Sequence, residues 1–193
     1  MKMGQFEKRF VNSARHSGHV AERAERRLRS TDPEPGQRLL DVGCGNGAVA
    51  IRAARAFGLS SVGVDLDPEQ IEAARLAADG LQGVSFLVAD ATALPFPDGE
   101  FDLVYSNKTT HHIADWPGAL AEMARVLKPG GKLVYADFVA PFGHRLPTRP
   151  GIDSTAAAHG LERQHAARTL VHYSASYRAT DRTDQPLVPV SRA

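Results

Sequence analysis

Short apolar runs alternate with segments of helical periodicity along the middle of the chain. The apolar runs, which are typical of buried strands, lie at residues 38–42, 60–66, 84–89, 101–105 and 132–138. Apolar residues recur every three to four positions, as on one face of a helix, in the intervening segments 48–57, 68–79 and 117–127. Strands that alternate with helices at this spacing predict an α/β fold with a parallel sheet covered by helices on both faces.

The pattern continues, less regularly, on both sides of this region. After residue 138 we expect a loop over 141–150, a short helix over 152–159, and an antiparallel pair of strands at 161–166 and 169–177 that completes the sheet. The main domain is placed at 37–179. Residues 180–193 are expected to form a flexible tail.

Residues 1–36 are predicted to be a helical extension. Val20, Ala24 and Leu28 recur every fourth residue and predict a helix over 16–29. The other face of this helix carries Arg15, Arg23, Arg26, Arg27 and Arg29. A solvated helix face is the simplest interpretation, and the alternatives are a lid over a ligand or a weak contact with an anionic partner.

The first predicted strand leads directly into three glycines at alternate positions, Gly43, Gly45 and Gly47. Glycine allows the backbone a positive φ and lets a ligand approach the main chain closely. The helix that begins behind these glycines offers unpaired N–H groups and a partial positive charge. The segment therefore indicates a strand, a glycine turn and a helix that together hold an anionic ligand group.

Acidic and polar residues follow the other strands at the same place. Asp65 and Asp90 come at the ends of the second and third strands, and the polar segment 106–112 follows the fourth. Right-handed crossovers place the ends of parallel strands at one edge of the sheet, where open α/β sheets bind ligands. We therefore expect these residues and Asp41 to share one crevice.

Composition narrows the classes of partner. The 193 residues suit one domain, and a formal net charge of +1 gives no general attraction to nucleic acid or to anionic membranes. Cys44 is the only cysteine, which excludes an intramolecular disulfide and a thiolate metal cluster. No apolar run approaches the ~20 residues of a membrane span, and the N-terminal residues lack the apolar core of a signal peptide, so a soluble cytoplasmic protein is expected. The oligomeric state is left open.

Two ligand classes suit a glycine turn that is followed by an acid about 20 residues later. The first is a dinucleotide, because the spacing from Gly43 reads G-x-G-x-x-A and Asp65 lies twenty residues after Gly45. The second is S-adenosylmethionine, whose carboxylate can use the N–H groups of the turn. Its amino group, its ribose hydroxyls and its adenine amino group all require acceptors.

Four motifs in order carry a family resemblance. LLDVGCGNG, VGVDLD, VADATALPFPDGEFDLVYS and HHIADWPGALAEMARVLKPGGKLVYADF resemble the successive motifs of class I S-adenosylmethionine-dependent methyltransferases. The resemblance covers about residues 36–138 and is greatest to the small-molecule group that includes the ubiquinone/menaquinone biosynthesis methyltransferases. It implies a Rossmann-like, doubly wound, mostly parallel seven-stranded sheet with a reversed last strand. It also implies S-adenosylmethionine as cofactor and S-adenosylhomocysteine as product.

The resemblance assigns roles to particular residues. Asp41 and the turn from Gly43 to Gly47 would hold the methionine part, Asp65 the ribose hydroxyls, and Asp90 the adenine amino group. The backbone of Ala91 would donate to adenine N1. The cofactor-binding residues implied in this way are Asp41, Gly43, Cys44, Gly45, Asn46, Gly47, Asp65, Leu66, Asp90, Ala91 and Ser106.

Candidate catalytic residues follow the fourth strand. His111 and His112 are placed to accept a proton from a nucleophile that must lose one, although either could instead hydrogen-bond its own loop. Cys44 is interpreted as a small residue that fits the turn and not as a nucleophile. Asp137 follows the fifth strand, but one carboxylate does not make a metal site, so none is expected.

The function expected is methyl transfer from S-adenosylmethionine to an O, N or C atom of a small-molecule acceptor. The segment from Ser106 to Thr109 differs from the Asn-Pro-Pro-Tyr of many nucleic-acid and protein methyltransferases, which disfavours those acceptors. Three alternatives stay open: a cofactor-binding module without turnover, an RNA methyltransferase suggested by the N-terminal arginines, and an NAD(P)-dependent oxidoreductase. The Asp90-Ala91 pair and the KPGG segment disfavour the oxidoreductase.

Overall fold

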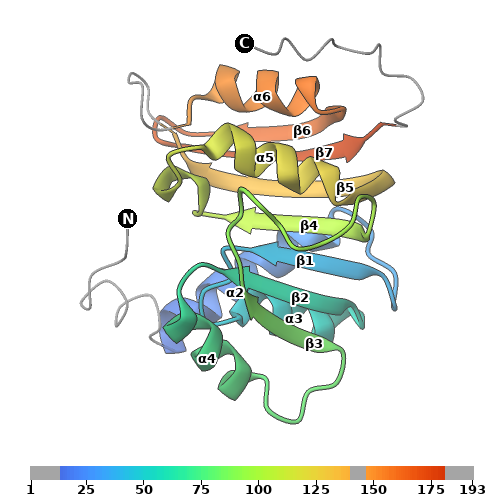
Figure 1. Ribbon diagram of the computed structural model, residues 1–193, viewed down its shortest axis with the longest axis vertical. Coiled ribbons are helices and arrows are strands. Elements are labelled where there is room, and N and C mark those ends of the chain that lie inside the picture. Colours follow the sequence, from blue (N-terminus) through green and yellow to red (C-terminus); the bar gives the residue numbers. More distant parts are fainter. Residues whose placement is uncertain (1–13, 140–146, 181–193) are drawn as a thin grey trace.

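The computed structural model describes residues 14–139 and 147–180, and a seven-stranded sheet forms its centre (Figure 1). The strands are β1 (Arg38–Val42), β2 (Ser60–Asp65), β3 (Val84–Val88), β4 (Phe101–Asn107), β5 (Leu127–Phe138), β6 (Leu161–Arg168) and β7 (His172–Ala179). They lie in the order β3-β2-β1-β4-β5-β7-β6. The pairs from β3 to β5 are parallel, whereas β7 runs antiparallel to β5 and β6. The predicted Rossmann-like α/β fold with a reversed last strand is confirmed.

Helices cover both faces of the sheet. They are α2 (Ala14–Arg29), α3 (Ala48–Phe57), α4 (Pro68–Ala77), α5 (Trp116–Arg125) and α6 (Arg149–Ala158), with the 3-10 turn η1 (Thr110–His112) after β4. Figure 1 shows α5 and α6 in front of the sheet and α2 and α3 behind it. Helix α4 shares a buried apolar cluster with α3. The doubly wound arrangement follows from the alternation of strands and helices along the chain.

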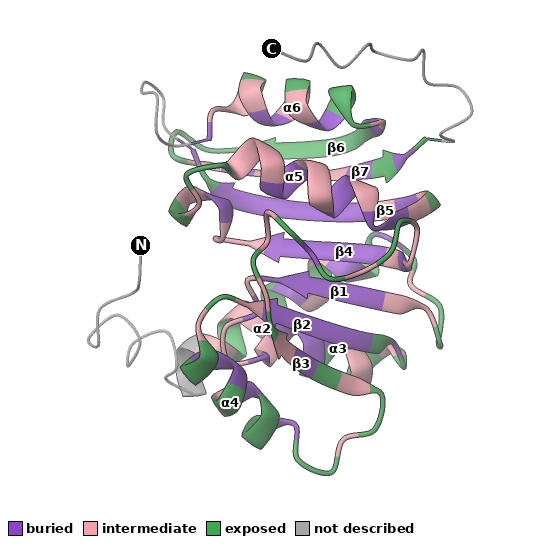
Figure 2. Cartoon of the chain, in the orientation of Figure 1, coloured by how far each residue is buried: buried purple, intermediate pink, exposed green. Residues whose placement is uncertain are grey.

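The central strands are buried on both faces, as Figure 2 shows. Leu40 and Val104 belong to the core under α5 and α6, whereas their neighbours Leu39 and Leu103 belong to the core under α2 and α3. Successive side chains of a strand point to opposite faces, so an unbroken apolar run is needed where both faces are covered.

Several strand boundaries differ from the prediction, among them those of β6 and β7, which end two residues later than expected, at Arg168 and Ala179. Strand β4 continues to Asn107, two residues past its predicted end, and β5 begins at Leu127 and not at Lys132. The KPGG segment, expected to end the preceding helix, therefore lies inside β5. Leu127 pairs with Phe101, and the register shifts before Lys132 pairs with Leu103. The positive φ of Gly130 accommodates this irregularity.

Both ends of the described chain join the core. The face of α2 that carries Ala24 and Leu28 packs against β1, β4 and α3, and both side chains are buried. The predicted C-terminal helix and antiparallel strand pair are present as α6, β6 and β7. Three segments lie outside the described residues: the residues before 14, residues 140–146, which include the first part of the predicted loop, and the predicted tail from 181.

No helix within residues 14–139 and 147–180 combines the length and the apolar character that crossing a membrane requires. The cytoplasmic location stays a prediction, as does the division of the chain into an extension, a main domain and a tail.

The three glycines after β1 have different neighbours, although all have positive φ, at 72°, 52° and 77° in chain order. A Cβ on Gly43 would lie 2.2 Å from Oγ1 of Thr109, and one on Gly47 would lie 2.6 Å from the ring of Phe86. A Cβ on Gly45 meets no atom of the described residues closer than 3.8 Å. Packing therefore requires Gly43 and Gly47 to be glycine, and only Gly45 leaves open space beside the main chain.

Replacing Gly43 with alanine is expected to lower the free energy of unfolding by about 2–5 kcal/mol. The left-handed backbone contributes about 1–2 kcal/mol of this loss. The overlap of the new methyl group with Thr109 contributes about 1–3 kcal/mol. Chemical denaturation of the two proteins measures the difference.

Gly80→Ala is the matched control, because Gly80 also has a φ of 72° but no atom lies within 4 Å of its Cβ position. This control should show only the backbone part of the loss. Adding Thr109→Gly to Gly43→Ala should recover stability, since it removes the overlapping atoms. Equal losses in the two alanine variants would show that the contact with Thr109 is not a constraint.

Candidate active site

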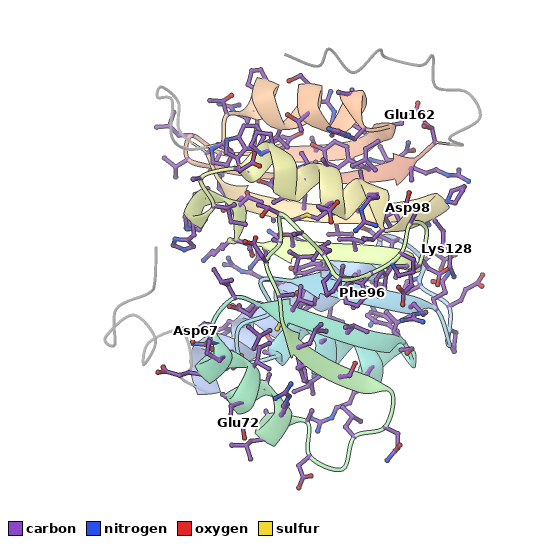
Figure 3. The ribbon with its side chains drawn as sticks, in the orientation of Figure 1. Asp67, Glu72, Phe96, Asp98, Lys128 and Glu162 are labelled. Carbon is purple, nitrogen blue, oxygen red and sulfur yellow. The ribbon has the colours of Figure 1, made fainter. Side chains whose placement is uncertain are left out.

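A cavity of about 490 Å³ opens at the carboxyl ends of strands β1 to β5. Asp67 borders it at the start of α4, and Figure 3 shows Asp67 at the opposite end of the strands from Lys128. Parallel strands bring these loops to one edge, as the sequence predicts. The predicted site residues that line the cavity are Asp41, Gly43, Cys44, Gly45, Asn46, Asp65, Leu66, Asp90, Ala91, His111 and His112.

Two predicted cofactor residues do not line the cavity. Gly47 is the N-cap of α3 and packs against Phe86 and Ala74. Ser106 is buried inside β4, and its Oγ has no hydrogen-bond partner among the described residues. Residues of the same motif therefore differ in where they lie: Gly47 and Ser106 belong to the core beneath the cavity.

Asp65 fixes the wall of the cavity at the end of β2. Its Oδ2 accepts a hydrogen bond from the backbone N–H of Gly45 at 2.9 Å, and its Oδ1 accepts one from the N–H of Asp67 at 3.0 Å. One carboxylate thus joins the glycine turn to the start of α4. Each carboxylate oxygen has a second acceptor site, so Asp65 is still able to accept from a ligand.

Asp41 places an unsatisfied carboxyl in the wall of the cavity. Its side chain is 2% exposed, and its Oδ2 has no hydrogen-bond partner among the described residues. Burial, together with the nearby charge of Asp65, raises the pKa of Asp41 to about 7, although a hydrogen bond from the backbone of Ala50 opposes the shift. A buried carboxyl oxygen without a hydrogen-bond partner is costly to keep, and a cationic ligand group would satisfy it.

The end of β3 presents an acid, and the end of β2 presents an apolar side chain. The Oδ1 of Asp90 accepts hydrogen bonds from the backbone N–H and the hydroxyl of Thr92, both at 2.8 Å, and these hold the pKa of Asp90 below its usual range. Leu66, at the end of β2, is 67% exposed where it borders the cavity. A flat apolar ligand group would cover this surface.

Helix α2 contributes residues to the cavity that the motifs did not identify. Ser17 and Val20 line it, and Oγ of Ser17 accepts a hydrogen bond from Nδ2 of Asn46 at 2.8 Å. The sequence analysis indicated a place for this helix near the ligand only through the alternative of a lid. In the glycine turn itself, burial raises the pKa of the Cys44 thiol well above its usual value, which disfavours a nucleophilic thiolate.

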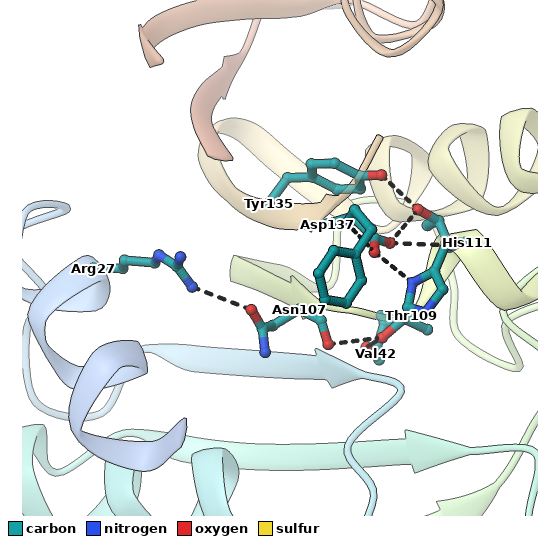
Figure 4. Close-up of polar contacts among 9 residues, drawn as sticks. Arg27, Val42, Asn107, Thr109, His111, Tyr135 and Asp137 are labelled. Atoms are coloured by element: carbon teal, nitrogen blue, oxygen red, sulfur yellow. Dashed lines mark hydrogen bonds and ion pairs between the residues drawn. The ribbon is translucent and has the colours of Figure 1, made fainter. Parts of the chain in front are cut away.

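His111 is held by a buried carboxylate. Its Nδ1 lies 2.5 Å from Oδ1 of Asp137, and its backbone N–H donates to Oδ2 of Asp137 at 3.2 Å (Figure 4). The hydroxyl of Thr110 donates to the same Oδ2 at 2.6 Å, and Tyr135 lies 2.5 Å from that hydroxyl. Burial alone would raise the pKa of Asp137, but these hydrogen bonds outweigh it and hold that pKa below its usual range.

Sequence reasoning considered Asp137 only as a metal ligand, so this pairing was missed. The signal was available, because Asp137 ends β5 and His111 follows β4, and these two strands are neighbours in the sheet. Hydrogen bonding to Asp137 assigns the proton of a neutral His111 ring to Nδ1 and leaves Nε2 as its acceptor. The ring of His112 packs at 3.8 Å from that of His111 and is more exposed.

A second polar contact joins α2 to the end of β4. The guanidinium of Arg27 donates to Oδ1 of Asn107 at 3.1 Å and reaches the hydroxyl of Tyr105 at 3.5 Å (Figure 4). Both Asn107 and Tyr105 line the cavity. Arg27, placed on the solvated face in the prediction, therefore points toward the site.

The pH dependence of stability should reveal Asp41. Between its unfolded pKa near 4 and its folded pKa of about 7, the folded protein keeps a proton that the unfolded chain has lost. The stability contributed in this way falls as pH rises and is gone above about pH 7, with a slope of at most about 1.4 kcal/mol per pH unit. Urea denaturation of the wild type and of Asp41→Asn between pH 4.5 and 8 measures it.

The asparagine variant should lack this decline, so the difference in stability between the two proteins should change with pH. Other titrating groups are common to both proteins and cancel in the comparison. Stability curves that stay parallel over the whole range would show that Asp41 titrates normally.

Comparisons with known proteins agree with this geometry. A family model described as "Methyltransferase domain" matches residues 40–135. The chain is 40% identical over 124 residues to the 27-O-demethylrifamycin SV methyltransferase of Amycolatopsis mediterranei, a match that covers 63% of this chain and 44% of that protein. The chain spans half or less of the length of the curated relatives it matches.

Solved structures share the fold. A putative sarcosine dimethylglycine methyltransferase from Galdieria sulphuraria superposes with a TM-score of 0.77 at 16% identity, over 84% of this chain and 86% of that one. The [4+2]-cyclase SpnF superposes with a TM-score of 0.75 at 22% identity, over 83% and 81%. Family match, sheet order and the position of the cavity all agree, and the chain belongs to the class I S-adenosylmethionine-dependent methyltransferases.

Proposed function

We propose that the protein transfers a methyl group from S-adenosylmethionine to an O, N or C atom of a small molecule. The observation that carries the proposal is one cavity in which acids at the ends of β1, β2 and β3 lie beside a histidine held by a buried aspartate. The similarity to the 27-O-demethylrifamycin SV methyltransferase supports a small-molecule acceptor.

The residues present fit S-adenosylmethionine. Asp41 offers a buried carboxyl oxygen that has no partner among the described residues, which suits an ammonium group. Gly45 leaves open space beside the main chain, and its neighbour Asp65 has acceptor capacity for ribose hydroxyls. Asp90 would accept from the adenine amino group, and Leu66 would pack against the ring. The cofactor would supply an activated methyl group on a sulfonium, because a neutral thioether is a good leaving group.

His111 would act on the acceptor. Asp137 orients its ring and fixes the tautomer in which Nε2 accepts, so His111 is able to take a proton from a hydroxyl group, or from an ammonium group that becomes a nucleophilic amine on losing it. The carboxylate also stabilises the imidazolium that forms. A carbon acceptor that is already nucleophilic would need only alignment and exclusion of water.

A specific observation disfavours the RNA alternative. Glu25 of α2 pairs with Arg29 at 2.7 Å and with Arg52 at 2.6 Å, so part of the positive charge of this face is neutralised within the protein. The fold is also shared with a cyclase, which keeps the alternative of a module without methyl transfer in view. Experiments on binding and on turnover separate these possibilities.

Thermal unfolding in the presence of S-adenosylmethionine, S-adenosylhomocysteine, NAD and NADP tests the cofactor. A ligand at ~100 times its Kd adds about 2.7 kcal/mol of stability. For a chain of this size, that should raise Tm by roughly 5–10 °C. We expect this rise with the two adenosyl compounds alone. A rise with NAD or NADP alone would overturn the proposal.

Replacing His111 with glutamine should lower kcat/KM for a hydroxyl acceptor identified by screening about 10²–10⁴-fold, the usual contribution of a general base. Binding of S-adenosylhomocysteine should be unchanged. The loss should shrink for acceptors of lower pKa, because an acceptor that is already ionised needs no base.

His112→Gln is the matched control, since His112 neighbours His111 and lines the same cavity without the contact to Asp137. It should retain most of the activity. Retained activity in the His111 variant across all acceptor pKa values would assign His111 a structural role.

A further inference from the structure

The two ends of the cavity carry opposite charges. Four acids, Asp41, Asp65, Asp67 and Asp90, line it along β1, β2 and β3. At the β4 and β5 end, Lys108 is the only lysine or arginine among the described residues that line it. The proposed cofactor accounts for Asp41, Asp65 and Asp90, and Asp67 caps α4, but nothing in the proposed methyl transfer yet accounts for Lys108.

The backbone of Lys108 is held in an unusual conformation. Its φ is 56°, in the left-handed region that is uncommon for residues other than glycine and asparagine. Its N–H donates to the carbonyl of Ala136 in β5 at 2.8 Å, and the hydroxyl of the next residue, Thr109, donates to the carbonyl of Val42 at 3.1 Å. The position of Lys108 is therefore fixed by both neighbouring strands, and strained positions of this kind cluster at functional sites.

The ammonium group of Lys108 lies against the same aromatic ring as the candidate base His111. It lies 5.1 Å from the centre of the Phe138 ring, and the centre of that ring lies 5.2 Å from the centre of the His111 ring, with the two rings almost perpendicular. Within residues 14–139 and 147–180, no carboxylate forms an ion pair with Lys108. A lysine beside the candidate base thus has an aromatic face but no anion.

The surroundings add positive charge. Arg27 points to the same strand end through Asn107. Burial lowers the pKa of His172, and the charges of Arg27 and Lys108 lower it further. Asp137 is the acid of this region, and its oxygens are taken by His111, Thr110 and the N–H of Phe138. This end of the cavity therefore has a net attraction for an anion.

We propose that Lys108 binds an anionic group, a carboxylate or a phosphate, on the methyl acceptor, which makes it a specificity-determining residue. The inference rests on the proposed methyl transfer. An acceptor anchored in this way would place its nucleophile near His111, since both residues contact the ring of Phe138. Lysine serves as a point charge for such groups.

A contact with the carboxylate of the cofactor is the rival role for Lys108. The position of Lys108 favours a contact with the acceptor. Its backbone is hydrogen-bonded to β5, whereas the residues that suit the cofactor lie at the ends of β1, β2 and β3. The two roles differ in a measurable way: only a cofactor contact would weaken the binding of S-adenosylhomocysteine.

Calorimetric titrations of the full chain, saturated with S-adenosylhomocysteine, test the proposal. The probes are benzoate, phenyl phosphate and the neutral benzamide. We expect at least one of the two anions to bind at least ten-fold more tightly than benzamide. Tighter binding of benzoate indicates a carboxylate site, and tighter binding of phenyl phosphate indicates a phosphate site. Lys108→Met should reduce this preference to less than three-fold and leave the affinity for S-adenosylhomocysteine within three-fold of the wild type.

Lys128→Met is the matched control, because Lys128 pairs with Asp102 at the other end of the strands (Figure 3). It should keep the full preference for anions. Absence of anion binding in the wild type, an unchanged preference in Lys108→Met, or a ten-fold loss of S-adenosylhomocysteine affinity in that variant would each overturn the proposal. Failure of the wild type to bind S-adenosylhomocysteine would instead refute the proposed methyl transfer, and with it this inference.

Discussion

The contact of Thr109 with Gly43 and Val42 joins the two halves of the cavity. The hydroxyl of Thr109 donates to the carbonyl of Val42, and its side chain fills the space that a Cβ on Gly43 would occupy. The segment that follows β4 therefore rests directly on the glycine turn that follows β1. Because this segment also carries Lys108 and His111, one close contact fixes the distance between the acids of the first three strands and the basic residues of β4 and β5.

A second constraint is the cost of burying Asp137. A carboxylate without exposure to water must be matched by donors, and here His111, Thr110 and the backbone of Phe138 supply them. The carboxylate and the groups that donate to it depend on one another. The carboxylate is stabilised only while the histidine ring and the turn η1 keep their places, so the network that satisfies a buried charge also sets the orientation of the proposed base. Tyr135 extends the same network into the core.

The sequence predicted most of the fold because the signals are local. Apolar runs such as 38–42, helix caps such as Asp67 before Pro68, and Gly58 as a stop each act within a few residues. The features that it did not predict depend on partners far apart in the chain. Thr109 meets Val42 across 67 positions, Arg27 meets Asn107 across 80, and His111 meets Asp137 across 26. Gly47 and Ser106 carry the motif but lie beneath the cavity, since a motif records spacing and not the direction in which each residue faces.

The buried carboxyl of Asp41 keeps a proton in the wall of the cavity. Near neutral pH, a substantial fraction of the empty protein holds that proton, because burial raises the pKa of Asp41 to about 7. A cationic group that arrives beside the carboxyl favours its ionised form and displaces the proton into solvent. Binding of such a ligand is then an exchange of one positive charge for another. Its affinity increases with pH until Asp41 is fully ionised, and the heat of binding depends on which buffer takes up the released proton.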